Sequence, residues 1–283
     1  MNILVTGAAG QLGQCLQIAA KAYPNYHFNF KNSTDLDIAS AEAIESIFSQ
    51  KKYDFCINAA AYTNVEKAES KPERAFLINA EAVKNLAKTC KKYQTKLIHV
   101  STDYVFDGEK EESYSEEDKV NPINVYGASK LKGEKYIQET LETFFIIRTS
   151  WLYSQFGHNF FKTILQKAKE GATLNITTEQ KGNPTNANDL AALILKIIEK
   201  KSEAYGIYHF SNLEEATWYD FAKSIVSLQP HTKAVLHASN SYKTKAKRPL
   251  NSCLDKKKVI STFGVSILSW RNSLENLYQT YIK

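Results

Sequence analysis

Short apolar segments alternate with longer amphipathic segments along the first half of the chain. The apolar segments have the length of buried strands, and they are residues 2–6, 26–30, 54–58, 96–101 and 144–150. The segments between them have apolar positions at helical spacing, and they are a stretch ending near residue 22, then 41–50, 72–93 and 121–136. Strands that alternate with helices predict right-handed crossovers and a parallel sheet covered on both faces. We therefore predict an α/β fold with a Rossmann-type, doubly wound sheet.

The pattern becomes less regular after Trp151. It predicts helices at residues 159–171, 186–200, 217–226 and after Ser269. It also predicts one short strand at residues 206–210. We interpret this part as a smaller substrate-binding lobe. The predicted domains are a dinucleotide-binding domain at 1–150 and a second lobe at 151–283, interleaved with the first.

Composition and charge limit the classes of function. The chain has 283 residues, and its hydrophobic fraction of 43% is sufficient for a full core. The net charge of +6 comes from lysines scattered among acids, which argues against nucleic acid as a partner and suits an anionic small molecule. The four cysteines are far apart and indicate neither a zinc site nor a disulfide framework. With no signal peptide or membrane-spanning segment recognisable, we expect a cytoplasmic protein without a membrane partner.

A glycine-rich loop follows the first predicted strand and begins a helix. Its glycines are Gly7, Gly10 and Gly13. In such a loop the first glycine permits a tight turn, the second lets the backbone approach a pyrophosphate, and the third lets the helix pack closely on the strand. The helix N-terminus adds N–H donors and a positive potential. The loop therefore predicts a dinucleotide-binding site.

The residues after the second predicted strand bear on the choice of cofactor. An acidic residue there usually binds the ribose of NAD, but this chain has Lys31, Asn32 and Ser33. Since Lys31 could meet a 2′-phosphate, the sequence favours NADPH, with NADH as the alternative. Asp37 and Ile38 follow, in a loop that we expect to lie beside the adenine of the cofactor. Small side chains after the third strand, in residues 58–63 including Ala60, leave room for a cofactor near the backbone.

Tyr126 and Lys130 lie one turn apart on a helix that we expect to begin at Asn121 and Pro122. Thr102 at the end of the fourth strand completes what a carbonyl reduction needs: a group that positions the carbonyl, a proton donor and a cation. We expect Lys130 and the positive charge of an oxidised nicotinamide to bring the pKa of Tyr126 toward neutral.

A different interpretation makes Tyr126 an ordinary aromatic residue of the core. Lys130 would then pair with Glu134 one turn later, on a solvated helix face. Trp151 could likewise be simple packing between the lobes. Arg248 suits the clamping of a diphosphate because guanidinium binds phosphate in a bidentate manner, but it could also belong to a solvated run of charges.

The chain resembles the dTDP-4-dehydrorhamnose reductases, a family of the extended short-chain dehydrogenase/reductase superfamily. The motifs that carry the resemblance span nearly the whole chain: NILVTGAAGQLG, NAAAYTNVEKAE, STDYVFDG, NVYGASKLKGE, RTSWLY, GNPTNANDLA, GIYHFSN, TWYDFA and RPLNSCLD. The resemblance implies that NADPH delivers a hydride to the C4 ketone of a dTDP-sugar while a tyrosine protonates the oxygen.

The resemblance also implies roles for individual residues. Thr102, Tyr126 and Lys130 would be catalytic. The cofactor would lie along Gly10, Gln11 and Leu12 at its pyrophosphate, and along Asp37, Ile38, Ala61, Tyr62 and Thr63 elsewhere. The sugar would meet Thr102, Asp103 and Trp151.

Some members of this family dimerise around magnesium held by glutamates, and this chain has Cys15 at the matching early position of the first helix. Because a thiol is a poor magnesium ligand, we expect no such metal site, although a homodimer formed in another way is compatible with the sequence.

Other functions remain possible at this point. A related 4-ketoreductase would give the C4 epimer, a 6-deoxy-L-talose. A non-catalytic NADP-binding subunit would resemble the regulatory subunit of methionine adenosyltransferase. A dehydratase or epimerase is disfavoured, because Tyr104 follows Asp103 where dehydratases need a second acid, and because no acid follows the second strand.

Overall fold

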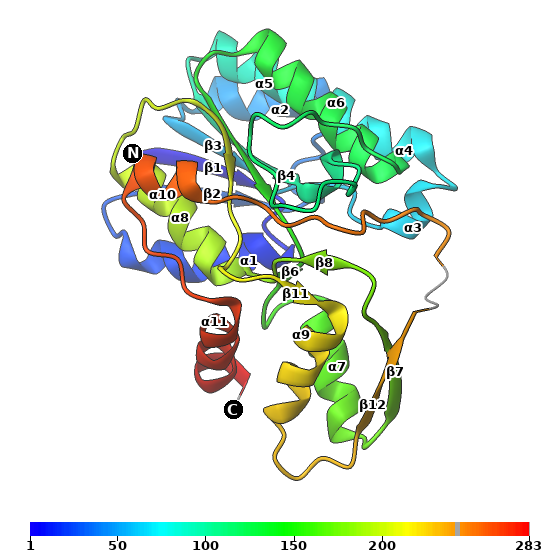
Figure 1. Cartoon of the computed structure of the whole chain (residues 1–283). Helices are drawn as coiled ribbons and strands as arrows, with labels where there is room; N and C mark the ends of the chain where they lie inside the picture. The colour runs from blue at the N-terminus through cyan, green and yellow to red at the C-terminus, as the bar shows by residue number, and fades with distance from the viewer. Residues whose placement is uncertain (241–243, 283) are drawn as a thin grey trace.

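A six-stranded parallel sheet forms the centre of the computed structural model, which describes residues 1–240 and 244–282 (Figure 1). Its order is β10-β5-β4-β3-β1-β2. The strands are β1 (Asn2–Thr6), β2 (His27–Lys31), β3 (Phe55–Asn58), β4 (Lys96–Thr102), β5 (Phe144–Thr149) and β10 (Gly206–His209). The order reverses at β1, as in doubly wound folds, so the carboxyl ends of the central strands open into one crevice.

Helices cover both faces of this sheet. The helices on one face are α1 (Gln11–Ala19), α8 (Ala187–Glu199) and α10 (Lys257–Phe263), which share one apolar core with the sheet. The helices on the other face are α2 (Ala41–Gln50), α5 (Ala82–Lys92) and α6 (Val125–Thr140), which contribute to a second core. The short helices α3 (Val65–Ala68) and α4 (Pro72–Phe76) precede α5, and a π-helical turn at Leu77–Glu81 joins α4 to α5. The predicted fold class is confirmed.

A smaller lobe lies beside the carboxyl edge of the sheet, below the sheet layer in Figure 1. Its helices are α7 (Phe160–Lys169), α9 (Trp218–Ser227) and α11 (Trp270–Leu277), and the parallel strands β7 (Thr173–Thr177) and β12 (Val235–Ser239) pair with one another. Two short strand pairs join this lobe to the sheet layer: β6 (Leu152–Tyr153) with β9 (Thr185–Asn186), and β8 (Lys181–Gly182) with β11 (Ala216–Thr217). Its core contains the buried rings of Tyr153, Phe161, Phe221 and Trp270.

The sheet layer also uses later parts of the chain. The edge strand β10 pairs with β5, and both α8 and α10 pack on the sheet although they follow residue 150. The division into domains at residue 150 stays a prediction. The three-dimensional arrangement means that the chain passes between the two layers several times.

The start of α6 differs from the prediction. The helix begins at Val125, because the side chain of Asn124 accepts a hydrogen bond from the Gly127 N–H at 2.8 Å. Asn121 is not the cap: its side-chain amide donates to Asp107 at 3.2 Å, and its N–H donates to the Val105 carbonyl at 2.8 Å. Both asparagines suit a helix N-terminus, and a contact distant in the sequence decides between them.

Candidate functional site

A cleft of about 820 Å³ runs along the carboxyl edge of the sheet and continues into the smaller lobe. Most of the residues predicted from the sequence line it: Gly7, Gly10, Gln11, Leu12, Asp37, Ile38, Ala60, Ala61, Tyr62, Thr63, Thr102, Asp103, Tyr126, Lys130, Trp151 and Arg248. Gly13 and Lys31 are not among the lining residues. Strands and helices distant in the sequence therefore meet at one site, as ligand binding in an open α/β sheet requires.

The glycine loop fits a pyrophosphate without side chains in the way. Gly7 has φ +71°, and a Cβ there would lie 2.6 Å from the Ala59 carbonyl carbon. A Cβ on Gly13 would lie 2.3 Å from the Gly7 oxygen, so Gly13 lies under the loop and holds α1 close to it. No side chain caps the N-terminus of α1 at Gly10. The loop therefore leaves the N-terminus of α1 to serve an anionic ligand.

The end of β2 presents amide and hydroxyl groups to the cleft. Asn32 and Ser33 line it, while the carbonyl of Lys31 accepts a hydrogen bond from the Ala8 N–H at 3.0 Å. Asp37 lines the cleft and accepts a hydrogen bond from the Ala39 N–H at 2.9 Å. The predicted contact of Lys31 with a 2′-phosphate stays a prediction.

Thr102 and Asp103 form a buried pair at the end of β4. The Thr102 hydroxyl donates to Asp103 Oδ1 at 2.9 Å and accepts from the Tyr104 N–H at 3.2 Å. Asp103 Oδ2 is buried and has no hydrogen-bond partner among residues 1–240 and 244–282. Burial raises the pKa of Asp103 to about 6. Oδ1 of this carboxyl group is satisfied by Thr102, and Oδ2 is the atom that a ligand hydroxyl or amide could satisfy.

Tyr126 faces the same part of the cleft. Its ring packs edge to face on Tyr104, with centroids 5.9 Å apart. Burial raises the pKa of Tyr126 above its ordinary value, and Thr102 lowers it only in part. The predicted lowering toward neutral is thus not found in the protein alone. A cation bound next to the phenol would be needed to produce it.

Lys130 lines the cleft but is almost fully buried, with 1% of its surface exposed. Its Nζ donates to the Val100 carbonyl at 2.7 Å and lies 3.1 Å from His99 Nε2. Burial lowers the pKa of Lys130 to about 8. The alternative interpretation, a solvated pair with Glu134, is wrong because Glu134 is fully buried and bonded to Arg148 at 2.7 Å.

Two stacked indole rings lie in the part of the cleft nearest the smaller lobe. The rings of Trp151 and Trp218 are parallel within 6°, with centroids 3.7 Å apart. A Cβ on Gly182 would lie 2.5 Å from the Trp151 ring, so this glycine makes room for the ring. Trp218 also donates from Nε1 to the Gln180 side chain at 3.0 Å. Trp218 was not predicted as a site residue, and the only local signal for it is an aromatic side chain at the start of a predicted helix.

Arg248 lies at the mouth of the cleft and is not part of a solvated run of charges. Its guanidinium bonds to Glu66 at 2.9 Å, and Glu66 also accepts from the Lys245 N–H at 2.9 Å. The adjacent segment is tied to the loop after β4: Asn251 donates to the carbonyls of residues 110–112.

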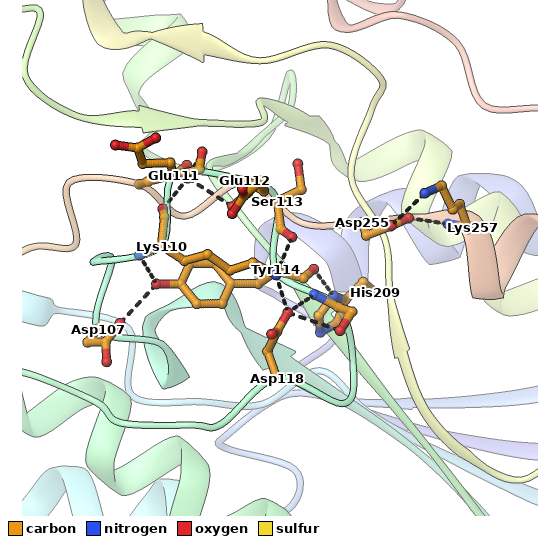
Figure 2. Close-up of polar contacts among 12 residues, drawn as sticks. Asp107, Lys110, Glu111, Glu112, Ser113, Tyr114, Asp118, His209, Asp255 and Lys257 are labelled. Carbon is orange, nitrogen blue, oxygen red and sulfur yellow. Dashed lines mark hydrogen bonds and ion pairs between the residues drawn. The ribbon is translucent and has the colours of Figure 1, made fainter.

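The loop after β4 is itself held by Tyr114, as Figure 2 shows. The Tyr114 hydroxyl accepts from the Lys110 N–H at 3.1 Å and donates to Asp107 at 2.9 Å. Its backbone carbonyl lies 3.1 Å from His209 Nδ1. Arg248 is therefore positioned by an ordered frame of hydrogen bonds.

Comparison with known proteins agrees with this geometry. Residues 1–282 match the family model described as the RmlD substrate binding domain. The dTDP-4-dehydrorhamnose reductase of Aggregatibacter actinomycetemcomitans is 37% identical over 289 residues, 98% of each chain.

Solved structures agree as well. The dTDP-4-dehydrorhamnose reductase of Bacillus anthracis, in complex with NADP, is 34% identical with a TM-score of 0.93, and 98% of each chain is covered. The Clostridium acetobutylicum structure of that name is 35% identical with a TM-score of 0.94 over 100% of both chains. The chain belongs to the dTDP-4-dehydrorhamnose reductase family. The family predicted from the sequence motifs is confirmed.

Cys15 is buried in the core of the sheet layer, and the expectation that no magnesium-bridged dimer forms stays a prediction. This cysteine is 1% exposed and lies in the core between α1, α8 and the sheet. In the part of the chain that the structure describes, no three His, Cys, Asp or Glu side chains are grouped as a metal site.

None of the described helices has the length and apolar character needed to cross a membrane.

Proposed function

We propose that the protein reduces the C4 ketone of dTDP-4-dehydro-L-rhamnose to give dTDP-L-rhamnose, with NADPH as the hydride donor. The observation that carries the proposal is the meeting of Thr102, Tyr126 and Lys130 in one cleft with the glycine loop of β1. The family supports the same reaction, since its members in other organisms carry this name.

The chemistry follows from where these side chains lie. When bound, the nicotinamide supplies the hydride that reduces the carbonyl carbon. Tyr126 protonates the carbonyl oxygen as negative charge develops on it. Lys130, which lies one turn later on the same helix, favours the phenolate that this proton transfer leaves. In the free protein Thr102 accepts from the Tyr104 N–H and donates its single hydroxyl proton to Asp103, and this proton turns to the substrate oxygen when the sugar binds.

The cofactor fits the first part of the cleft. We infer that its pyrophosphate binds at Gly10, Gln11 and Leu12, where the N-terminus of α1 is uncapped by side chains. The amide and hydroxyl of Asn32 and Ser33 leave room for a 2′-phosphate without repelling it, which supports NADPH over NADH. The NADP bound to the B. anthracis relative supports the same choice.

We infer that the sugar nucleotide binds in the second part of the cleft, near the smaller lobe. Asp103 Oδ2, unsatisfied among the described residues, would accept from a sugar hydroxyl. Trp151, with Trp218 stacked on it, offers an apolar surface to a deoxysugar. Arg248 would bind the diphosphate in addition to Glu66, since a guanidinium has five N–H donors.

The direct experiment follows NADPH and NADH oxidation by absorbance with enzymatically prepared dTDP-4-dehydro-L-rhamnose, and identifies the product by NMR. Tyr126→Phe should lose at least about 100-fold in kcat because the proton donor is removed. Tyr53→Phe is the control for loss of a tyrosine hydroxyl: Tyr53 is 1% exposed, and its hydroxyl accepts from the Asn29 side chain outside the cleft.

The outcomes separate the alternatives. A rhamnose product supports the proposal, and a 6-deoxy-talose product assigns the protein to the sister 4-ketoreductases. Tight cofactor binding without oxidation would favour a non-catalytic binding subunit. A cytoplasmic location, a homodimer and the absence of a nucleic-acid partner stay predictions, which cell fractionation, sedimentation and binding assays would check.

A further inference from the structure

A buried row of polar side chains connects Lys130 with the first strand of the sheet. Thr6, Asn58 and His99 are register partners on β1, β3 and β4, so their side chains are neighbours across the sheet. Asn58 Nδ2 lies 3.0 Å from His99 Nδ1, and His99 Nε2 lies 3.1 Å from Lys130 Nζ. Thr6 and Lys130 are 1% exposed, and Asn58 and His99 are fully buried. None of the residues Thr6, Asn58 and His99 lines the cleft.

One group fixes the direction of the hydrogen bonds in this row. The backbone N–H of Ala60 can only donate, and it donates to Asn58 Oδ1 at 3.2 Å. Asn58 must therefore present its NH₂ group to His99. Because an NH₂ group only donates, His99 Nδ1 has to accept, and the proton of a neutral ring is then on Nε2. Burial and Lys130 lower the pKa of His99 well below its ordinary value, so the ring carries a single proton.

The tautomer of His99 determines which protonation state of Lys130 can form a hydrogen bond with the ring. The Nε2–H group points at Lys130 Nζ, and only an amine with a lone pair can accept from it. An ammonium would instead face this N–H with N–H groups of its own. The Val100 carbonyl, at 2.7 Å from Nζ, accepts one of the amine protons.

The other titratable group that acts on Lys130 is Glu134 on its own helix, which raises the pKa of Lys130. Its carboxylate is already bonded to Arg148 and to the Ser101 hydroxyl. Glu134 therefore does not replace His99 as a partner of Nζ. Burial lowers the pKa of Lys130 to about 8, which agrees with an amine that is easily deprotonated.

We propose that Asn58 and His99 are positioning residues for Lys130: Asn58 holds His99 in the Nε2–H tautomer, and His99 donates to the amine of Lys130 once that amine has lost its extra proton. Protonation of Lys130 must break this hydrogen bond, so the pair determines the pH at which the lysine takes up its proton. The proposal rests on the function proposed above only for the statement that Lys130 takes part in the reaction.

The test is a long-range ¹H–¹⁵N correlation spectrum of the histidine rings in the free protein, with the His99 signals assigned by their loss in His99→Gln. Wild type should show Nε2 protonated and Nδ1 bare at neutral pH. In Asn58→Asp the carboxylate still accepts from Thr6 and Ala60 but also accepts from Nδ1–H, so the tautomer should switch. Thr6→Val is the control, because Ala60 still orients Asn58, and the tautomer should stay Nε2–H.

A lysine ¹³Cε titration, assigned with Lys130→Met, should place the midpoint of Lys130 at or below about pH 8 in wild type and Thr6→Val. A wild-type ring protonated at Nδ1, or at both nitrogens, would overturn the proposal, as would an unchanged tautomer in Asn58→Asp. If Asn58→Asp does not fold, the wild-type spectrum decides alone. These spectra need no substrate, so they give their answer even if the protein fails to reduce the sugar.

Discussion

Two sets of buried charged side chains lie around α6, and they differ in whether opposite charges meet. Arg148 and Glu134 form an ion pair at 2.7 Å, with side-chain exposures of 3% and 0%. Lys130 and Asp103 are also buried, at 1% and 3%, but neither has an ion-pair partner among the described residues. Lys130 and Asp103 line the cleft, whereas Arg148 and Glu134 do not.

The difference separates a structural role from a chemical one. A paired guanidinium and carboxylate balance one another and hold α6 on β5. A buried charge without a partner destabilises the fold, and its pKa moves toward neutral: to about 8 for Lys130 and to about 6 for Asp103. Groups that change protonation near neutral pH are concentrated at active sites, so the second set supports the proposal that Lys130 and Asp103 lie where the chemistry takes place.

The sharpest way to test the paired set is Arg148→Met. The substitution leaves the Glu134 carboxylate buried without its cation, and the free energy of unfolding should fall by about 3–5 kcal/mol. Urea unfolding measures the change. The double variant Arg148→Met with Glu134→Leu, which removes both charges, should recover a large part of it. A loss below about 1 kcal/mol in the single variant would mean that the pair is not structural.

Lys130→Met should have the opposite pattern. Turnover should fall at least about 100-fold, because the proposed reaction uses the charge of Lys130, one helical turn after Tyr126. The free energy of unfolding at pH 7 should rise or stay within about 1 kcal/mol of wild type, since an unpaired buried cation is removed and one hydrogen bond to Val100 is lost. Steady-state kinetics and urea unfolding of the same preparation check both. A loss of stability as large as that of Arg148→Met would contradict the comparison.

The pH dependence of stability gives a finer test for Lys130. Its folded pKa of about 8 lies below the ordinary 10.5, so between these values the unfolded chain binds more protons than the folded one. Stability should therefore rise from about pH 8 to 10.5, by about 3 kcal/mol relative to Lys130→Met. Denaturant unfolding across this range measures the difference. Parallel curves for the two proteins would show that Lys130 titrates normally.

The smallest expected effect belongs to Asp103, the buried carboxyl group without an ion-pair partner among the described residues. Its folded pKa of about 6 lies above the ordinary 3.8, so the folded protein binds more protons between these values. Stability relative to Asp103→Asn should fall as the pH rises from 3.8 to about 6, by somewhat under about 3 kcal/mol. Unfolding at acid pH checks the sign. A wild type that gains stability over this range would mean that Asp103 has a favourable partner.

Local patterns in the sequence predicted most of the sheet layer. α2 was predicted at its observed bounds, and the strands β1 to β5 were predicted within a residue or two at each end. β7, β12 and α10 were missed. Most positions of the two strands are exposed or partly buried, and the strands pair with one another across more than fifty residues, so no local apolar run marks them. The predicted start of α6 was wrong because either Asn121 or Asn124 could cap the helix N-terminus. Only contacts in the folded structure select Asn124.

The candidate site shows the same limit. Gly7, Tyr126 and Lys130 carry local signals: a glycine loop after a strand, and two functional groups one turn apart on a helix. His99 and Asn58 carry none, since His99 is one polar residue among several in β4 and Asn58 ends the otherwise apolar β3. Their relation to Lys130 arises only from strand register and from α6 packing against β4. Trp218 belongs to the cleft for a similar reason, because it stacks on a residue distant in the sequence.

The most direct measurement is turnover of dTDP-4-dehydro-L-rhamnose with NADPH by Lys130→Met and Arg148→Met, each at a temperature where it is fully folded. The account predicts that Arg148→Met retains most of the wild-type kcat when folded, while Lys130→Met loses at least about 100-fold although it is no less stable. Equal losses of turnover in the two folded variants would contradict the division between a structural charge pair and a chemical one.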